Sequence, residues 1–182
     1  GWKEDFQIIY QFPISSQILA KNYFDQTINL FDRKIYVGGH SKGGNLAMYA
    51  YMYGKNSWKK KVKKVYNFDG PGFLSSVAYS NLFLEMCDKL MMVVPKESVI
   101  GMILSCGNYK VVNSHAKGIL QHDGYTWECF GGKFIPTILS RKSEKLKNNL
   151  QEYLDSMSES EKKSFVETFF AVFEKTKITN IM

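Results

Sequence analysis

The 182 residues are 45% hydrophobic and 15% aromatic, which is enough for one globular domain with a sizeable core and too apolar for a disordered chain. No apolar run approaches the length that crosses a bilayer. Much of the formal net charge of +7 comes from the lysine-rich run between Lys55 and Lys64, which we interpret as a solvated segment because no nucleic-acid-binding motif accompanies it.

Apolar patterns along the first two thirds of the chain alternate between strand-like and helix-like spacing, which predicts an α/β fold with a mostly parallel sheet flanked by helices. The predicted helices cover 15–31, 43–53, 73–90 and 98–105. The predicted strands cover 34–38, 63–68, 91–94, 109–112 and, as a fifth, 125–130.

From Arg141 the composition shifts to charged residues at helical spacing, which predicts a core over 1–140 followed by C-terminal helices over 141–182. Ser158 and Glu161 form a capping-box pattern at the start of the last helix. Phenylalanines at helical spacing follow it and predict a stripe that packs on the core or on a partner: Phe165, Phe169, Phe170 and Phe173.

The turn at 39–43 fits the G-x-S-x-G pattern of a nucleophile elbow, with strand-forming residues before it and helix-forming residues after it. Such a turn holds Ser41 in a strained conformation with its hydroxyl above the end of the strand. Gly39 and Gly43 lack a Cβ and are expected to let strand and helix approach each other closely. The backbone N–H of Lys42, at the start of the helix, is then directed at an oxyanion formed beside Ser41.

A serine hydroxyl is a weak nucleophile at neutral pH and needs an imidazole base that a carboxylate orients. His40 lies inside the elbow, where its side chain is expected to point away from the hydroxyl, and we interpret it as structural. His115 and His122 both lie in polar loops downstream. The turn-like loop around His122, between strand-like segments, makes it the favoured base and leaves His115 as the alternative.

The acid is expected at the end of a strand beside the nucleophile strand. Asp69 ends the second predicted strand, and the breaker cluster Gly70-Pro71-Gly72 after it exposes a carboxylate at the correct edge of the sheet. Glu97, after the third strand, is the alternative acid. The plain alternative for Asp69 is a turn-forming residue that bonds its own backbone.

Four ordered blocks of this sequence resemble a known family. They are residues 38–47, 67–73, 94–102 and 121–123 together with Trp127. They look like a bacterial lipase-like family of unknown function that is similar to the fungal-type (class 3) lipases, and the resemblance covers residues 1–135. It implies the α/β-hydrolase fold, a nucleophile at Ser41 and a base at His122.

In that fold several strands precede the elbow, and a loop after one of them supplies the second oxyanion donor. Only 38 residues precede Gly39, which is too few for those strands. We therefore expect the N-terminal part of the domain to be missing, with half of the oxyanion hole absent and a sheet edge exposed. Two copies of the chain can pair at such an edge.

The sequence thus predicts a serine hydrolase of carboxylic esters, lipase- or esterase-like in substrate. Ser41 attacks, His122 moves the proton, and Asp69 orients His122. The alternative is an inactive hydrolase-like scaffold that binds a partner or a lipid surface.

We expect no cofactor and no metal. A phosphate-binding loop has its lysine after its last glycine, whereas Lys42 precedes Gly43 and Gly44. The cysteines lack the spacing of metal ligands. The odd set Cys87, Cys106 and Cys129 predicts free thiols in the reducing cytoplasm. Nucleic acid is not an expected partner. Contact of the lysine-rich run with an anionic membrane surface stays open.

Overall fold

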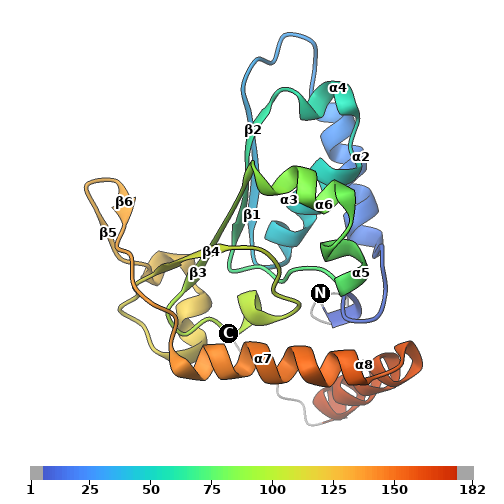
Figure 1. Cartoon of the computed structure of the whole chain (residues 1–182), viewed down its shortest axis with the longest axis vertical. Coiled ribbons are helices and arrows are strands. Elements are labelled where there is room, and N and C mark those ends of the chain that lie inside the picture. Colours follow the sequence, from blue (N-terminus) through green and yellow to red (C-terminus); the bar gives the residue numbers. More distant parts are fainter. Residues whose placement is uncertain (1–5, 176–182) are drawn as a thin grey trace.

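The computed structural model describes residues 6–175 of the chain, and the side chains of residues 6–168. A four-stranded parallel sheet forms its centre, with the strands in chain order (Figure 1). The strands are β1 (Ile35–His40), β2 (Val62–Phe68), β3 (Leu90–Pro95) and β4 (Tyr109–Val112). All three strand pairs are parallel, and helices lie in the crossovers, so the predicted α/β fold class is confirmed.

Helices and short turns connect and flank the strands. The helices are α2 (Ser15–Thr27), α3 (Lys42–Tyr53), α4 (Asn56–Lys59), α5 (Ser75–Ala78), α6 (Asn81–Cys87), α7 (Arg141–Ser156) and α8 (Glu159–Lys175). The 3-10 turns are η1 (Ile100–Met102), η2 (Gly118–His122) and η3 (Gly124–Thr126). Of the helices in the described part, none is long and apolar enough to cross a membrane.

The prediction of a fifth sheet strand at 125–130 is wrong. Residues 124–126 belong to η3, Trp127 forms only an isolated bridge with Ser114, and the strand β5 covers Cys129–Phe130 alone. It pairs antiparallel with β6 (Lys133–Phe134) in a separate hairpin. The reason is local: Gly131 and Gly132 both adopt positive φ, at 58° and 74°, and close a tight turn directly after β5.

Three predicted helices are also shorter than expected. The helix predicted at 15–31 ends at Thr27, and Ile28 after it is extended. The segment 73–90 divides into α5 and α6 because Ser80 caps a new helix, its hydroxyl accepting a hydrogen bond from the Phe83 N–H. Of the segment 98–105 only η1 is helical. The N–H of Gly101 within it donates to the carboxylate of Asp69 instead of continuing a helix.

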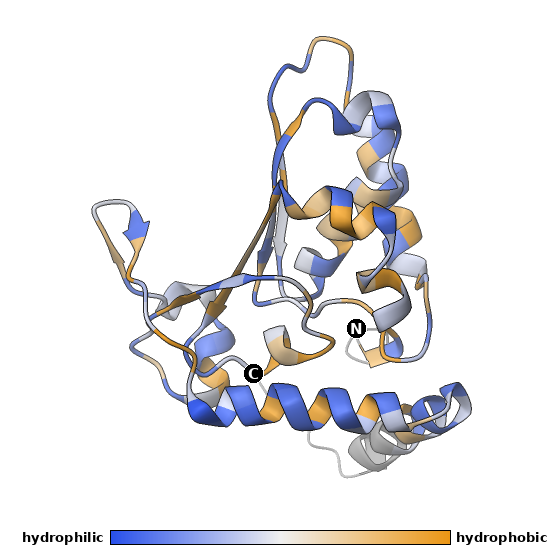
Figure 2. Cartoon of the chain, viewed as in Figure 1, coloured by the Kyte–Doolittle hydropathy of each residue, from blue (hydrophilic) through white to orange (hydrophobic). Residues whose placement is uncertain are grey.

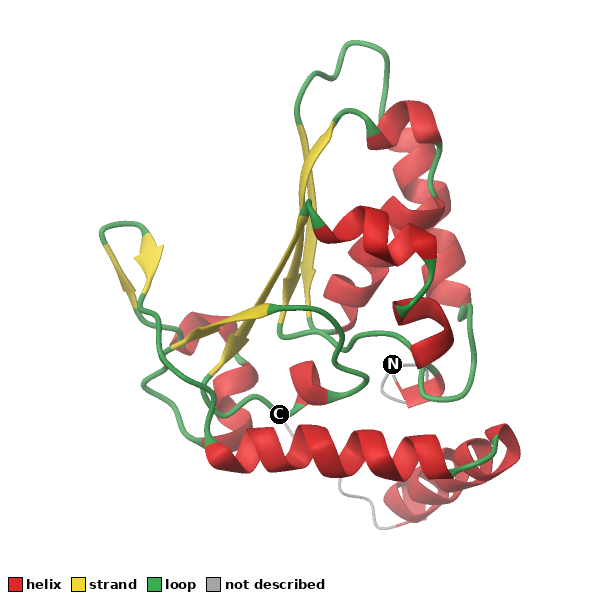
Figure 3. Cartoon of the chain, in the orientation of Figure 1, coloured by secondary structure: helices red, strands yellow, loops and turns green. Residues whose placement is uncertain are grey.

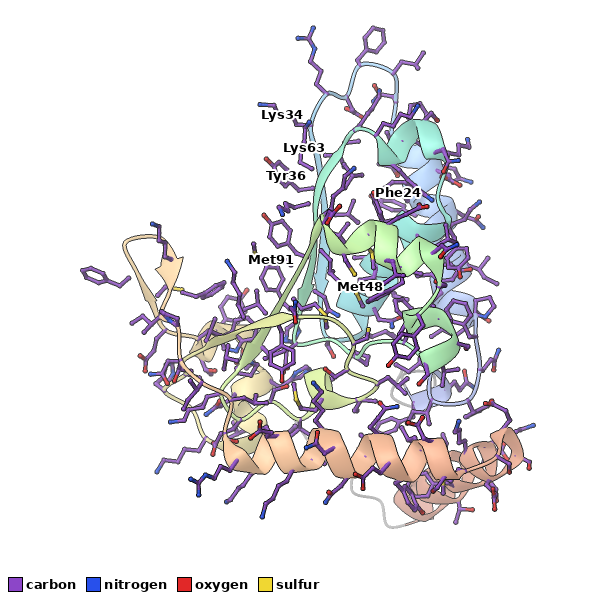
Figure 4. All side chains as sticks on the ribbon, viewed as in Figure 1. Phe24, Lys34, Tyr36, Met48, Lys63 and Met91 are labelled. Carbon is purple, nitrogen blue, oxygen red and sulfur yellow. The ribbon has the colours of Figure 1, made fainter. Side chains whose placement is uncertain are left out.

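The two faces of the sheet have different coverings. Helices α2, α3 and α6 lie together on one side (Figure 3), and Phe24 and Met48 lie on that side (Figure 4). This face holds the largest apolar cluster, which includes the fully buried Met48 and Val65. Tyr36, Lys63 and Met91 lie on the opposite side (Figure 4), where Tyr36 is 61% exposed.

On this second face, an aromatic row crosses the strands. The Tyr36 and Tyr66 rings are 6.5 Å apart between centroids, and the Tyr66 and Phe68 rings 5.7 Å apart. Trp127 covers Phe68 at 6.2 Å. Strand β1 is at the edge of the described sheet, and pairing of two copies there stays a prediction.

The C-terminal helices pack beside the carboxyl ends of the strands (Figure 1). Helix α7 begins at Arg141 and is mostly hydrophilic, with apolar positions recurring along it (Figure 2). Its buried Leu154 joins Ile8, Ile9 and Leu104 in a second apolar cluster, to which α8 contributes Val166. The division into a core and a C-terminal region stays a prediction.

The capping box at the start of α8 is confirmed, because the Ser158 N–H donates to Glu161 at 2.7 Å and the Glu161 N–H donates to the Ser158 hydroxyl at 3.3 Å. In the predicted stripe, Phe165 is 41% exposed. The side chains of Phe169, Phe170 and Phe173 lie outside the described residues.

Buried amides connect the helices to the turn after β2. The Gln17 side chain of α2 donates to Asn45 of α3 at 2.8 Å, and Asn45 donates to the carbonyl of Gly72 at 2.6 Å. Asn67 both donates to the carbonyl of Gly70 and accepts from its N–H. Gln17, Asn45 and Asn67 are at most 1% exposed, so each bond satisfies a group that water cannot reach.

We predict that Asn45→Ala lowers the free energy of unfolding by about 3 kcal/mol, because it leaves the Gln17 amide and the Gly72 carbonyl buried without a partner. Chemical denaturation measures this loss. The same substitution at Asn149, on the exposed surface of α7, is the matched control and changes stability by less than about 0.5 kcal/mol. Equal effects at the two positions would contradict the role of the buried amides.

Candidate functional site

The elbow has the geometry that its sequence pattern predicts. His40 ends β1 and Lys42 begins α3, so Ser41 alone makes the turn, with φ 57° and ψ −134°. A non-glycine residue adopts positive φ only at a cost and where its surroundings enforce it. The N–H of Ser41 donates to the carbonyl of Phe68 at 2.9 Å, which fixes this strained residue against the end of β2.

Close packing of strand and helix at the elbow depends on two glycines. A Cβ on Gly39 would lie 2.3 Å from the backbone of Gly43, and a Cβ on Gly44 would lie 2.2 Å from the Asn67 side chain. A Cβ on Gly43 would meet nothing within 4 Å. The expectation that Gly43 is needed for the close approach is therefore wrong, and Gly44 has that role because it faces β2.

Asp69 lies directly beside the elbow. The register of the parallel strands pairs His40 with Phe68, so the next residues, Ser41 and Asp69, leave the sheet together at its carboxyl edge. The turn after Asp69 is pressed against the elbow, because a Cβ on Gly70 would lie 2.2 Å from the carbonyl oxygen of Ser41. Asp69 itself has a positive φ of 49°, so both strands end in a left-handed residue.

The carboxylate of Asp69 is fully buried and bonded on both oxygens. Its Oδ2 accepts from Nδ1 of His122 at 2.8 Å. Its Oδ1 accepts from the Ser98 hydroxyl and, at 3.2 Å, from the N–H of Gly101. These donors come from distant segments, which does not fit the plain alternative of a turn former bonding its own backbone.

His122 is the last residue of η2, and its ring packs against the ring of His40. The two rings are 4.5 Å apart between centroids, and a ring nitrogen of His40 lies 2.6 Å from the carbonyl oxygen of His122. A carboxylate at Nδ1 favours the tautomer that carries its proton there, which leaves Nε2 as the nitrogen that can accept one. The His122 side chain remains 20% exposed, whereas Asp69 is closed off from solvent.

Glu97, the alternative acid, occupies a different place. Its carboxylate accepts from the N–H of Gly118 at 2.7 Å and from the Gln121 amide at 3.2 Å, and its own N–H donates to Gln121. It therefore holds the turn that carries His122. Asp69, the favoured acid, is the carboxylate that the structure brings to the imidazole.

His115, the alternative base, is also placed elsewhere. Its N–H donates to the carbonyl of Thr126 at 3.1 Å, and it lines a cavity together with Lys96 and Glu97. The structure thus brings His122, and not His115, to the acid beside the elbow.

Sequence reasoning missed several residues that support this arrangement. Ser98 and Gly101 fix one oxygen of Asp69, Gln121 and Glu97 brace η2, and His40 supports the ring of His122. Ser98 and Gly101 fall within the block 94–102 that carries the resemblance, but nothing in their spacing from Asp69 indicates contact. Gly101 must be glycine because a Cβ there would lie 2.5 Å from Oδ1 of Asp69.

A small apolar cavity adjoins the elbow. It has a volume of about 20 Å³ and is lined by Ser41 and Lys42 together with apolar side chains. The apolar lining residues are Phe6, Ile8, Ile9, Pro71, Ile100 and Ile103. The wall beside Ser41 is therefore mostly apolar.

Other chemistries find little support nearby. Among the described residues, no group of three or more His, Cys, Asp or Glu side chains is arranged to hold a metal ion. All three cysteines are free thiols. Burial raises the pKa of the Cys106 thiol to about 12, so this residue is protonated at neutral pH and is a poor nucleophile.

We predict that Asp69→Asn removes the downfield proton NMR signal of the His122 Nδ1–H, because the carboxylate that fixes this proton is lost. Glu97→Gln, the matched carboxylate-to-amide control, leaves the signal in place. Loss of the signal in Glu97→Gln alone would contradict the geometry described above.

The chain was compared with known proteins. The profile of the Mbeg1-like family matches residues 1–171. A search of curated proteins gave no match. Because the matched region extends over nearly all of the 182 residues and includes the elbow, Asp69 and His122, this chain belongs to the Mbeg1-like family.

Proposed function

We propose that this protein is a serine hydrolase of carboxylic esters, lipase- or esterase-like in substrate, with Ser41 as nucleophile, His122 as base and Asp69 as the orienting acid. One observation carries the proposal: the buried Asp69 carboxylate accepts a hydrogen bond from His122 directly beside a serine held at φ 57°. A serine, an imidazole and a carboxylate in these roles form the catalytic unit of acyl-transfer enzymes on several folds.

In the proposed reaction, the Ser41 hydroxyl attacks the ester carbonyl carbon while Nε2 of His122 takes its proton. The tetrahedral intermediate collapses, the alcohol leaves with the proton from His122, and the acyl group stays on Ser41. Water then attacks the acyl group with His122 again as base, which releases the acid and restores the serine. Asp69 keeps the imidazole oriented and stabilises its positive charge in both steps.

Lys42 is proposed to stabilise the oxyanion through its backbone N–H. It is the first residue of the 12-residue helix α3, and the N–H groups of a helix's first turn point outward from its positive end. A donor aimed at the developing charge is worth roughly 10²–10³ in rate in enzymes of this kind.

The chemistry around Ser41 supports an apolar acyl group. Isoleucine, phenylalanine and proline side chains line the cavity of about 20 Å³ beside it. The Mbeg1-like family is lipase-like, and membership of it also supports an ester with an apolar acyl group as the substrate. We place the reaction in the cytoplasm, in keeping with free thiols at Cys87, Cys106 and Cys129.

The second candidate is an inactive hydrolase-like scaffold that binds a partner or a lipid surface. The small size of the cavity beside Ser41 favours it, as does the exposed aromatic and basic face around Tyr36 and Lys63. The two candidate functions differ in whether the Ser41 hydroxyl reacts as a nucleophile.

We predict that a fluorophosphonate probe labels the protein at one site and that Ser41→Ala abolishes the labelling, because the probe reacts with an activated serine. Intact-mass measurement gives the stoichiometry. Ser156→Ala, an exposed serine at the end of α7, is the control and keeps full labelling. A wild-type protein that stays unlabelled favours the scaffold.

We predict that Asp69→Asn lowers kcat/KM for short p-nitrophenyl esters by about 10⁴-fold, because the imidazole loses the carboxylate that selects its tautomer. Glu97→Gln lowers it by no more than about tenfold, since Glu97 acts only through the turn that carries His122. The reverse order of the two effects would assign the acid to Glu97.

A further inference from the structure

A second cavity lies apart from Ser41, Asp69 and His122. It has a volume of about 620 Å³ and lies where β3 and β4 end, between the loops at 96–99 and 113–118 and the first turn of α7. The N–H of Ser140, which caps α7, donates to the carbonyl of Lys96 at 2.8 Å and fixes the helix start at this place. Open α/β sheets commonly bind ligands at the carboxyl ends of their strands.

Three lysines from three separate segments line this cavity. Lys96 follows β3, Lys117 precedes η2, and Lys142 lies in the first turn of α7. Within the described part of the chain, none of the three ammonium groups forms an ion pair with a carboxylate. Glu97 is the one acidic residue among the described residues that line the cavity, and it accepts hydrogen bonds from Gly118 and Gln121. The three lysines therefore outnumber the negative charge in the wall.

Other polar residues also line the cavity. Asn113, Ser114 and His115 line it with further polar side chains. Gln121 and Ser143, which are 3% and 4% exposed, form part of its wall. The positive end of the 16-residue helix α7 adds to the field of the lysines.

The lysine-rich run at 55–64 differs from this cluster. Its Lys59, Lys61 and Lys64 donate to backbone carbonyls. Lys60 and Lys63 are exposed, as are Lys96, Lys117 and Lys142, but they line no cavity described here. The run is continuous in the sequence, whereas the three lysines of the cavity converge only in the fold.

We propose that this cavity binds a phosphate group carried on a small organic body. Several cationic donors around one space suit a doubly charged group with several oxygens. The volume is in the range of small-molecule sites, and Val99 and Leu146 offer apolar surface to the remainder of the molecule. Such a group occurs in soluble phosphate esters and in the headgroups of anionic lipids.

The test uses the full chain and glycerol 3-phosphate as probe, with binding measured by titration calorimetry. The double variant Lys96→Ala/Lys142→Ala weakens binding by at least about tenfold. Lys60→Ala/Lys63→Ala, which removes the same charge from exposed positions, changes it by less than about twofold. Equal weakening in both double variants, or no saturable binding by the wild type, overturns the proposal.

A second measurement does not depend on variants. Amide NMR signals of Gly118 and His115 shift as glycerol 3-phosphate is added, while that of Lys63 does not. Shifts confined to residues 55–64 overturn the proposal.

Vesicles separate the two sources of the phosphate. Co-sedimentation with vesicles of phosphatidate in phosphatidylcholine, lost in Lys96→Ala/Lys142→Ala and reversed by glycerol 3-phosphate, identifies a lipid headgroup. Saturable binding of glycerol 3-phosphate without co-sedimentation identifies a soluble ester.

Discussion

The buried carboxylate of Asp69 is the point on which the rest of the candidate site depends. A carboxylate removed from water is costly unless its oxygens are hydrogen-bonded, and here both oxygens have donors. The donors come from the segment after β3 and from η2, so one side chain holds together three regions that are far apart in the chain. His122 is positioned because it supplies one of these donors.

The elbow and Asp69 are joined by backbone geometry as well. Ser41 and Asp69 follow adjacent parallel strands at the same register, and both have positive φ. The Ser41 N–H bonds the end of β2, and the turn at Gly70 packs on the Ser41 carbonyl. The backbone around Asp69 therefore holds Ser41, and the backbone of Ser41 packs on the turn after Asp69. The buried amides of Asn45 and Asn67 also bond this turn, at Gly72 and Gly70.

The segment after β3 links the two cavities described above. Ser98 and Gly101 face Asp69, while Lys96 and Glu97 line the cationic cavity. Because Glu97 also holds η2, a ligand in that cavity contacts the same wall that positions His122. The segment after β3 therefore contacts both places, although none of Ser41, Asp69 and His122 lines the cationic cavity.

The sequence by itself determined the local features: the four parallel strands, the elbow with Ser41 at its apex, the capping box at Ser158, and Asp69 and His122 as the favoured partners. These depend on short-range periodicity, turn chemistry and the resemblance of four blocks. It mistook 125–130 for a sheet strand because the local turn at Gly131 and Gly132 was not recognised. It mistook Gly43 for the glycine of close approach because the packing of Gly44 on Asn67 depends on neighbours in space. Only the tertiary structure decided that Asp69 and not Glu97 meets His122, that Ser98 and Gly101 hold the acid, and that three lysines share one cavity. The physical reason is that hydrogen bonds and charge clusters between residues 20 to 80 positions apart are set by strand register and helix packing, which leave no pattern in the spacing of the residues.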